Sequence, residues 1–453
     1  MIQKTHMNSL LKLVSCLGIA LMMVFSMAPV LGTAEQAEAA TDVPGGSDAF
    51  AFEGNTNASL KNAAKDYPDA FDLRNVDGKS YITPVKIQNP YGTCWGFAAI
   101  ASAESSILAS GLADPETLDL SEKHLAYFST SYIDDPDNPQ NGEGIHFKNV
   151  SSEYKRTSAH RYNIGGIPLI ATSLFASGIG PNQEDRTDLD TGDSLKDLFA
   201  YKGANGEKVS RRVAIAYDEN DNPVDYGQRA LWYSSDDDWS IPDKYRFYQS
   251  YRLKDSFILP SPCELDENTG EYTHNRDGID AIKQQMYENH RAVTISFRAE
   301  SYLPGQDTSG KLFMSSKWAH YTNEPSGSNH AVTIVGWDDN YPKENFLEGK
   351  QPPENGAFLI KNSWGAETNG GFENNGYRHW GLLDGLDGIP YSDTATAKSD
   401  RATGYFWISY YDQSLNDPES FEFDKPTGDN GYYIEQHDYL QVNEIEKKKL
   451  KGS

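Results

Sequence analysis

The sequence predicts an α+β protein. Segments with apolar residues at helical spacing gather in the first half of the chain, and runs of β-branched and aromatic residues gather in the second half. We expect helices over 94–109, 121–128, 168–177 and 278–288, and strands over 292–297, 331–337, 356–362 and 404–411. Because helices and strands occupy different parts of the chain, they are expected to pack as separate layers, with a site between them.

The first forty residues predict export from the cell. Lys4 and Lys12 flank an apolar run that extends to about Leu31, and Ala37 to Ala39 provide an A-x-A cleavage pattern. Residues 1–39 are therefore interpreted as a signal peptide, which predicts a secreted or cell-surface protein. An uncleaved membrane anchor and a lipoprotein attached through Cys16 are the alternatives. Residues 40–68 have no hydrophobic period and are expected to form a linker or short pro-segment.

The formal net charge of -26 argues against nucleic acid as a partner, because a polyanion would be repelled over most of the surface. We expect one large domain over 69–415, with an acidic, loop-rich insertion near 182–262, and a C-terminal extension over 416–453. Acidic runs in the insertion lack the ordered spacing of a calcium loop, so they are interpreted as solvated surface. No metal and no organic cofactor is expected.

One of the three cysteines has a context suited to chemistry. Cys16 falls in the predicted signal peptide, while Cys94 and Cys263 can form at most one disulfide and no disulfide framework. Cys94 begins an Ala-rich helical segment just after a turn at Gly92. At a helix N-terminus the macrodipole and the open backbone N–H groups favour a thiolate and a developing oxyanion. The alternative is a buried structural thiol.

Three further residues can complete a nucleophilic site. His330 opens an apolar strand and can project from its end into a cleft, although a core histidine is the alternative interpretation. Asn362 ends the next strand and can fix the tautomer of the imidazole, and Trp364 can shield that hydrogen bond from water. Gln88 can fold back past the turn before Cys94 and add a side-chain N–H donor.

These segments resemble the papain family of cysteine peptidases. Residues 88–98 read Q-N-P-Y-G-T-C-W-G-F-A and are similar to the family's Q-x-x-C-G-S-C-W-A-F-A, while N-H-A-V at 329–332 and K-N-S-W-G at 361–365 resemble its other two motifs. By position, the resemblance implies Gln88 for the oxyanion hole, Cys94 as nucleophile, His330 as base and acid, and Asn362 as the orienting residue. It also implies a two-lobe fold with a helical N-terminal lobe and an antiparallel, β-barrel-like C-terminal lobe.

Shorter similarities indicate where a substrate would lie. Residues 163–166, N-I-G-G, resemble a family turn whose glycine backbone pairs with bound peptide. This match implies that Gly165 and Gly166 line the substrate cleft, with a plain turn before a helix as the alternative. We assign Asn329 and Trp364 to substrate binding as well.

The sequence also departs from the family pattern. Tyr91 and Asn163 stand where the family places a disulfide, so that bridge is absent. Cys94 and His330 are 236 residues apart, against about 130–150 in papain-like enzymes, and the insertion near 182–262 accounts for the difference. The segment 404–412 looks most like bacterial members that pair the peptidase with a lectin-like segment.

The sequence therefore predicts a secreted cysteine endopeptidase that hydrolyses polypeptides. An association with the cell surface or with carbohydrate is expected from the bacterial subgroup, and the oligomeric state is left open. One alternative is a non-catalytic cell-surface binding or adhesion protein on a peptidase scaffold. Another is a transpeptidase, in which an amine replaces water in the second step.

Overall fold

The protein is described here by a computed structural model. It describes residues 67–88, 91–131, 165–201, 211–217, 223–232, 240–266, 269–299, 313–365, 381–382 and 403–426. The expected signal peptide over 1–39, most of the linker, the most acidic runs of the insertion and the end of the C-terminal extension lie outside these residues.

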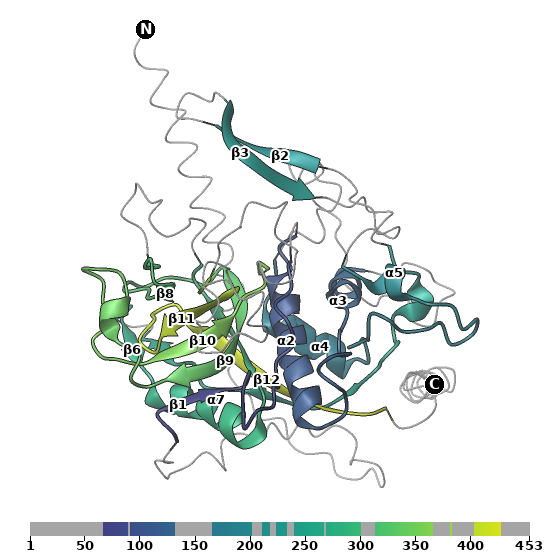
Figure 1. Ribbon diagram of the computed structural model, residues 1–453, viewed down its shortest axis with the longest axis horizontal. Coiled ribbons are helices and arrows are strands. Elements are labelled where there is room, and N and C mark those ends of the chain that lie inside the picture. The colour runs from purple at the N-terminus through teal and green to yellow at the C-terminus, as the bar shows by residue number, and fades with distance from the viewer. Residues whose placement is uncertain are drawn as a thin grey trace, which may run out of the picture. The chain divides into compact units, whose positions relative to one another are not determined.

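A sheet of eight strands forms the centre of the fold (Figure 1). Its order is β4 (Arg252–Ile258), β12 (Asn416–Asp424), β7 (Val293–Phe297), β9 (His330–Asp338), β10 (Ala357–Lys361), β11 (Tyr405–Ser409) and β8 (Ala319–His320). Strand β1 (Ala70–Asp72) pairs with the end of β9. All these pairs are antiparallel except β11 with β8. The sheet therefore brings the start of β9 and the end of β10 next to each other.

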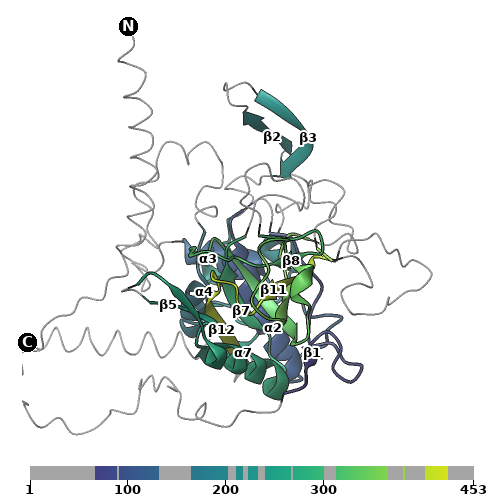
Figure 2. The ribbon, with the colours of Figure 1, turned by 90° about the vertical axis from the view of Figure 1, so that its left-hand side faces the viewer.

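Two helices cover opposite faces of this sheet. Helix α2 (Cys94–Ala109) packs against β9 and β12, with α3 (Glu122–Ser129) and α4 (Pro168–Ala176) beside it, and α7 (Arg276–Asn289) packs against β7 and β9 (Figures 1 and 2). Ala331 in β9 lies in the apolar core around α2, whereas Val332 and Ile334 lie in the core around α7. Successive side chains of a strand point to opposite faces, so Ala331 faces α2 while its neighbour Val332 faces α7.

Local sequence signals account for the helix ends. The side chain of Ser121 caps α3 by accepting the His124 N–H, and the side chain of Asn275 caps α7 by accepting the Asp277 N–H. Helix α2 consists mostly of small and apolar residues that are buried, and Gly111 with φ +66° follows it. The four helices and four strands expected from periodicity are present, with ends that differ by a few residues.

The structure differs from our expectation in two segments. The described part of the expected insertion, 182–201 and 240–262, packs into the protein: Phe199, Tyr245 and Tyr248 form an apolar cluster with Phe128 of α3. The same part includes α5 (Lys196–Phe199), a 3-10 turn over Asp243–Tyr245 and β4. Aromatic side chains that lie between acidic residues in the sequence account for this burial. The acidic composition of the segment had led us to expect surface loops.

The second difference concerns the residues after 415. We placed them in a C-terminal extension, but β12 lies inside the sheet between β4 and β7. Two short hairpins complete the described strands: β2 (Arg211–Tyr217) with β3 (Pro223–Trp232), and β5 (Cys263–Leu265) with β6 (Tyr272–His274). The arrangement is sheet-rich and mixed α+β, and the division into two lobes remains a prediction. None of the helices in the described ranges is long and apolar enough to cross a membrane.

Candidate active site

Cys94 is the first residue of α2. The preceding residue, Thr93, makes no side-chain capping bond, and its carbonyl accepts the Gly96 N–H at 2.9 Å. The thiol is 8 % exposed, and burial raises its pKa. Hydrogen bonds from the backbone N–H groups of Ala331, Trp95 and Cys94 itself act in the opposite direction. The sulfur therefore lies beside the backbone of Ala331, the residue that directly follows His330.

His330 and Asn362 form a buried pair. The imidazole Nε2 lies 2.8 Å from Asn362 Oδ1, and the Ser363 N–H donates to the same oxygen at 2.8 Å. An atom that accepts from a backbone N–H is the carbonyl oxygen of the amide, so Nε2 must be the donor and carry the proton. This tautomer leaves Nδ1 as an acceptor. Asn362 thus fixes the tautomer of the His330 imidazole.

The surroundings of His330 are dry. The ring of Trp364 stacks on the imidazole with centroids 4.7 Å apart, and His330 is 6 % exposed. Burial lowers the pKa of His330 to about 4, with the Asn362 hydrogen bond opposing that effect. The imidazole is consequently neutral near pH 7 in this structure and available to accept a proton.

Gln88 is held against the strand that carries Asn362. Its side-chain Nε2 donates to the Tyr91 carbonyl at 3.0 Å, and its Oε1 accepts from the Ser363 hydroxyl at 2.7 Å. Its backbone N–H donates to the Ser363 carbonyl at 2.8 Å, and an isolated β-bridge joins Ile87 to Trp364. The segment before Cys94 is therefore tied directly to the segment after β10.

Gly165 and Gly166 lie next to the start of α2. Gly165 has φ +76°, a conformation that favours glycine, and a Cβ on Gly166 would lie 2.5 Å from the indole of Trp95. A side chain at 166 would thus displace the residue that follows Cys94. The backbone conformation thus favours glycine at 165, and packing against Trp95 favours it at 166.

Asn329 has a structural partner in the described chain. Its side chain pairs with the backbone of Ala299, donating to the carbonyl at 3.0 Å and accepting the N–H at 2.7 Å. These bonds hold the start of β9 against the end of β7, which places His330. Trp364 is occupied by its stack on His330. Neither contact tests the expected role of these two residues in substrate binding.

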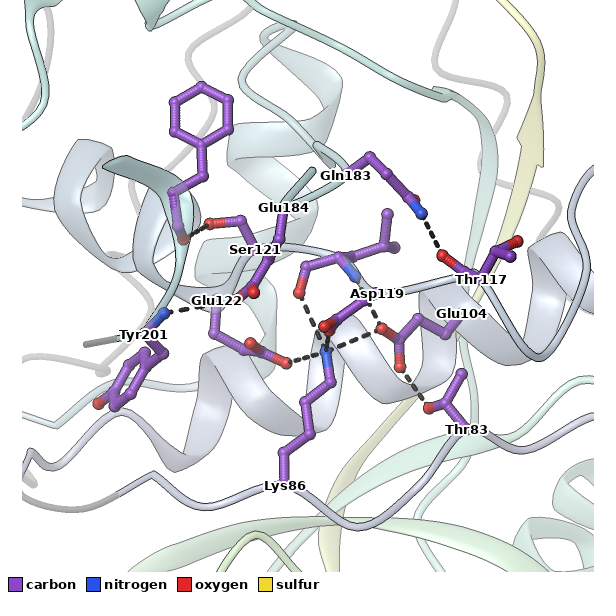
Figure 3. A network of polar contacts seen from close by, with 12 residues as sticks. Thr83, Lys86, Glu104, Thr117, Asp119, Ser121, Glu122, Gln183, Glu184 and Tyr201 are labelled. Carbon is purple, nitrogen blue, oxygen red and sulfur yellow. Dashed lines mark hydrogen bonds and ion pairs between the residues drawn. The ribbon is translucent and has the colours of Figure 1, made fainter. Parts of the chain in front are cut away.

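A cluster of charged side chains surrounds Lys86, as Figure 3 shows. Lys86 Nζ lies 2.9 Å from Glu104 Oε1, 2.7 Å from Asp119 Oδ1 and 2.9 Å from Glu122 Oε1. Burial lowers the pKa of Lys86, but the three carboxylates outweigh that effect and hold it well above its usual value. Burial also raises the pKa of Glu122 to about 7.

The cluster reaches the elements that carry the candidate residues. Glu104 of α2 accepts from the Thr83 hydroxyl and, at 2.9 Å, from the Leu120 N–H, while Lys361 Nζ donates to Thr83 Oγ1 at 3.0 Å. Lys361 immediately precedes Asn362. A small pocket beside the cluster is lined by Glu104, Lys361 and Asn362 among others.

Sequence reasoning missed Glu104 and the cluster around it. The available signal was a single acidic residue in an otherwise small and apolar helix, which indicates a buried charge with partners. In the ranges that the structure covers, no group of three or more His, Cys, Asp or Glu side chains is arranged to hold a metal ion.

Comparison with known proteins finds a family match around Cys94. Residues 67–134 match the family described as papain family cysteine protease. The match covers the segment from Phe71 through Gln88 and Cys94 to the end of α3. Over this stretch the chain is similar to papain family cysteine proteases.

Two known proteins are similar to parts of this chain. The chain is 41 % identical over 58 residues to cysteine proteinase 1 of Entamoeba histolytica, covering 13 % of this chain and 18 % of that protein. It is 24 % identical over 217 residues to peptidase 1 of Dermatophagoides farinae, covering 43 % of this chain and 62 % of that protein. The chain thus spans less than two thirds of either relative.

Among solved structures, the chain is similar to the cysteine protease and lectin-like domains of Cwp84, a surface layer associated protein of Clostridium difficile. The sequence identity is 19 % and the TM-score 0.43, over 81 % of this chain and 54 % of that one. A second structure of clostridial Cwp84, after propeptide cleavage, gives 19 % identity and a TM-score of 0.44, over 79 % of this chain and 58 % of that chain.

Proposed function

We propose that this protein is a secreted cysteine endopeptidase that cleaves polypeptides through Cys94, His330, Asn362 and Gln88. The observation that carries the proposal is the hydrogen bond between His330 Nε2 and Asn362 Oδ1, because it makes Nε2 the donor and leaves Nδ1 as the ring nitrogen that can accept a proton. The match of residues 67–134 to papain family cysteine proteases supports the same chemistry.

The reaction begins with the transfer of the Cys94 proton to His330 Nδ1. The thiolate attacks the carbonyl carbon of the scissile bond, and the imidazolium then returns the proton to the leaving amine. Water, deprotonated by the same imidazole, hydrolyses the acyl-enzyme and restores the thiol. Burial opposes charge on the sulfur and on the imidazole separately. A thiolate and an imidazolium formed together stabilise each other, which offsets that effect.

The oxyanion is stabilised by N–H groups at the start of α2. The backbone N–H of Cys94 and the amide of Gln88 are the proposed donors, each contributing on the order of 3 kcal/mol. Gln88 is suited to this role because its backbone and its Oε1 are both anchored on Ser363. Its Nε2 can keep one hydrogen on Tyr91 and direct the other to the substrate.

Export and association with a surface belong to the same proposal. They rest on the sequence of residues 1–39 and on the similarity of 404–412 to bacterial members with a lectin-like segment. Amino-terminal sequencing of the exported protein is expected to begin near residue 40. A mature protein that retains residues 1–39 would contradict the assignment as a cleaved signal.

Two cysteine variants test the proposed nucleophile. In wild-type protein an epoxide inhibitor of cysteine peptidases is expected to label Cys94 and to abolish cleavage of a fluorogenic peptide. Cys94→Ala should lose both labelling and cleavage. Cys263→Ala provides the matched control, because Cys263 is buried in the β5–β6 hairpin and burial raises its pKa to about 12.

Three results would separate the alternatives. Absence of labelling and of cleavage in the wild type would favour a binding protein. Transfer of the acyl group to an added amine in preference to water would favour a transpeptidase. Equal loss of activity in both cysteine variants would refute Cys94 as the nucleophile.

A further inference from the structure

The hydroxyl of Tyr201 bridges two residues that flank the turn before Cys94. It donates to the backbone carbonyl of Gln88 at 2.7 Å and lies 2.6 Å from the hydroxyl of Thr93. Tyrosine has one hydroxyl hydrogen, and the Gln88 carbonyl can only accept. Thr93 must therefore donate to Tyr201, which gives a chain of bonds from Thr93 through Tyr201 to Gln88.

Thr93 and Gln88, the two ends of this series of hydrogen bonds, both affect the proposed oxyanion site. Thr93 is the N-cap residue of α2, and its carbonyl accepts the N–H groups of Gly96 and Phe97. Its position therefore sets where the helix begins and where the Cys94 N–H points. Gln88 is the other proposed oxyanion donor. Thr93 is 1 % exposed and Gln88 7 % exposed, so water has little access to replace Tyr201 as their partner.

Tyr201 is itself held in place by the segment that we expected to be a surface insertion. Its ring meets the ring of Phe97 edge-on with centroids 4.8 Å apart, and its backbone N–H donates to Glu184 Oε1 at 3.3 Å, as Figure 3 shows. Two residues earlier, Phe199 is fully buried, and its carbonyl accepts from the Ser121 hydroxyl. Burial raises the pKa of Tyr201 well above its usual value, so the hydroxyl keeps its proton near neutral pH.

We propose that Tyr201 is a positioning residue for the oxyanion site, and that the segment 182–201 serves to hold it there. The inference rests on the proposed function for the part that concerns catalysis. Tyr201 acts through Gln88 and Thr93 and need not touch the substrate. Without its hydroxyl, the Gln88 carbonyl and the Thr93 hydroxyl lose their shared partner, and the two oxyanion donors lose their common anchor.

The test compares Tyr201→Phe with a matched variant, Tyr410→Phe. Tyr410 is also buried, and its hydroxyl donates to Asp339 at 2.6 Å, beyond the opposite end of β9 from His330. We expect Tyr201→Phe to lower kcat about ten-fold while KM changes by less than about twofold, because misplaced donors weaken the transition state more than the ground state. Tyr410→Phe should leave both constants near those of the wild type.

A peptide aldehyde separates oxyanion binding from the reactivity of the thiol. Its hemithioacetal places an oxygen in the oxyanion site, so Tyr201→Phe should weaken aldehyde inhibition about ten-fold. Alkylation of Cys94 by iodoacetamide forms no oxyanion and should change by less than about twofold. Thr93→Ser retains the donor to Tyr201 and should behave as the wild type, while Thr93→Val should share the defect.

The outcomes for this inference and for the proposed function are distinct. If the wild type is active and Tyr201→Phe matches it in kcat and in aldehyde affinity, the inference is overturned and the peptidase assignment stands. If the wild type neither cleaves peptides nor binds the aldehyde, the peptidase assignment fails. The positioning role is then decided by hydrogen exchange of the Gly96 and Phe97 amides, which should speed up about ten-fold in Tyr201→Phe. Unchanged exchange would refute it.

Discussion

Removal of the Glu104 carboxylate is expected to destabilise the protein strongly. Its side chain is fully buried, and it accepts three hydrogen bonds, from the Thr83 hydroxyl, the Lys86 ammonium and the Leu120 N–H. These donors come from the segment before Gln88 and from Leu120, which lies just before α3, so Glu104 joins both segments to α2. Glu104→Ala deletes the common acceptor and leaves its partners in a dry environment.

The size of the effect follows from what each donor loses. A buried donor without a partner costs about 1–3 kcal/mol, and breaking one side of a buried ion pair costs about 3–5 kcal/mol. Lys86 keeps Asp119 and Glu122 as partners, so losing its ion pair with Glu104 lowers the stability only slightly. We therefore expect Glu104→Ala to lower the free energy of unfolding by about 3 kcal/mol. Glu104→Gln retains an acceptor oxygen and should cost about half as much.

Urea unfolding followed by tryptophan fluorescence measures this difference. The midpoint should fall in the order wild type, Glu104→Gln, Glu104→Ala, with the slope against urea unchanged. Lys254→Met supplies the control, because the ion pair of Lys254 with Glu422 lies at the surface and should contribute less than about 1 kcal/mol. A Glu104→Ala variant no less stable than Lys254→Met would refute the reasoning.

Three further changes test other parts of the site. Asn362→Ala should lower kcat about 100-fold by freeing the imidazole of His330, and steady-state kinetics with less than about a threefold loss would contradict its orienting role. Burial raises the pKa of Glu184 from 4.5 to about 8, so the folded state binds more protons and stability is lost as the pH rises through that range. Glu184→Gln should reduce this loss of stability by about 2 kcal/mol, a value lowered because solvent screens a part-buried group. Identical pH profiles of the urea midpoint in wild type and Glu184→Gln would contradict this role of Glu184. Gly166→Ala should cost about 1–3 kcal/mol by pushing on Trp95, and an unchanged thermal midpoint would show that the indole moves freely.

Local pattern was sufficient for most elements of the fold. The Ala-rich run after Cys94 and the apolar runs before Trp337 and Asn362 carry their period in consecutive residues, so their helices and strands follow from sequence alone. Strand β12 was missed because Pro418 and several acidic residues interrupt its pattern. Its buried Phe421 and Phe423 face α4, which no neighbouring residue in the sequence reveals.

In the candidate site, too, some residues can be predicted from local sequence and others cannot. The four proposed catalytic residues are found by motifs, because each motif is contiguous and occurs in a fixed order. The groups that hold those residues in place are not contiguous with them. Tyr201 is 108 positions after Thr93, and Glu104 meets Thr83 and Leu120 only after the chain has folded. Such partners are selected by long-range packing, which leaves no local signature.

The interior place of β12 has a consequence for the order of folding. β12 is the last described strand along the chain, yet it pairs with β7 on one side and β4 on the other. Residues 416–424 must therefore be available before β4 can join the sheet through β12. The core beneath α4 also closes only then, because Phe421 and Phe423 of β12 pack against Phe175 of α4.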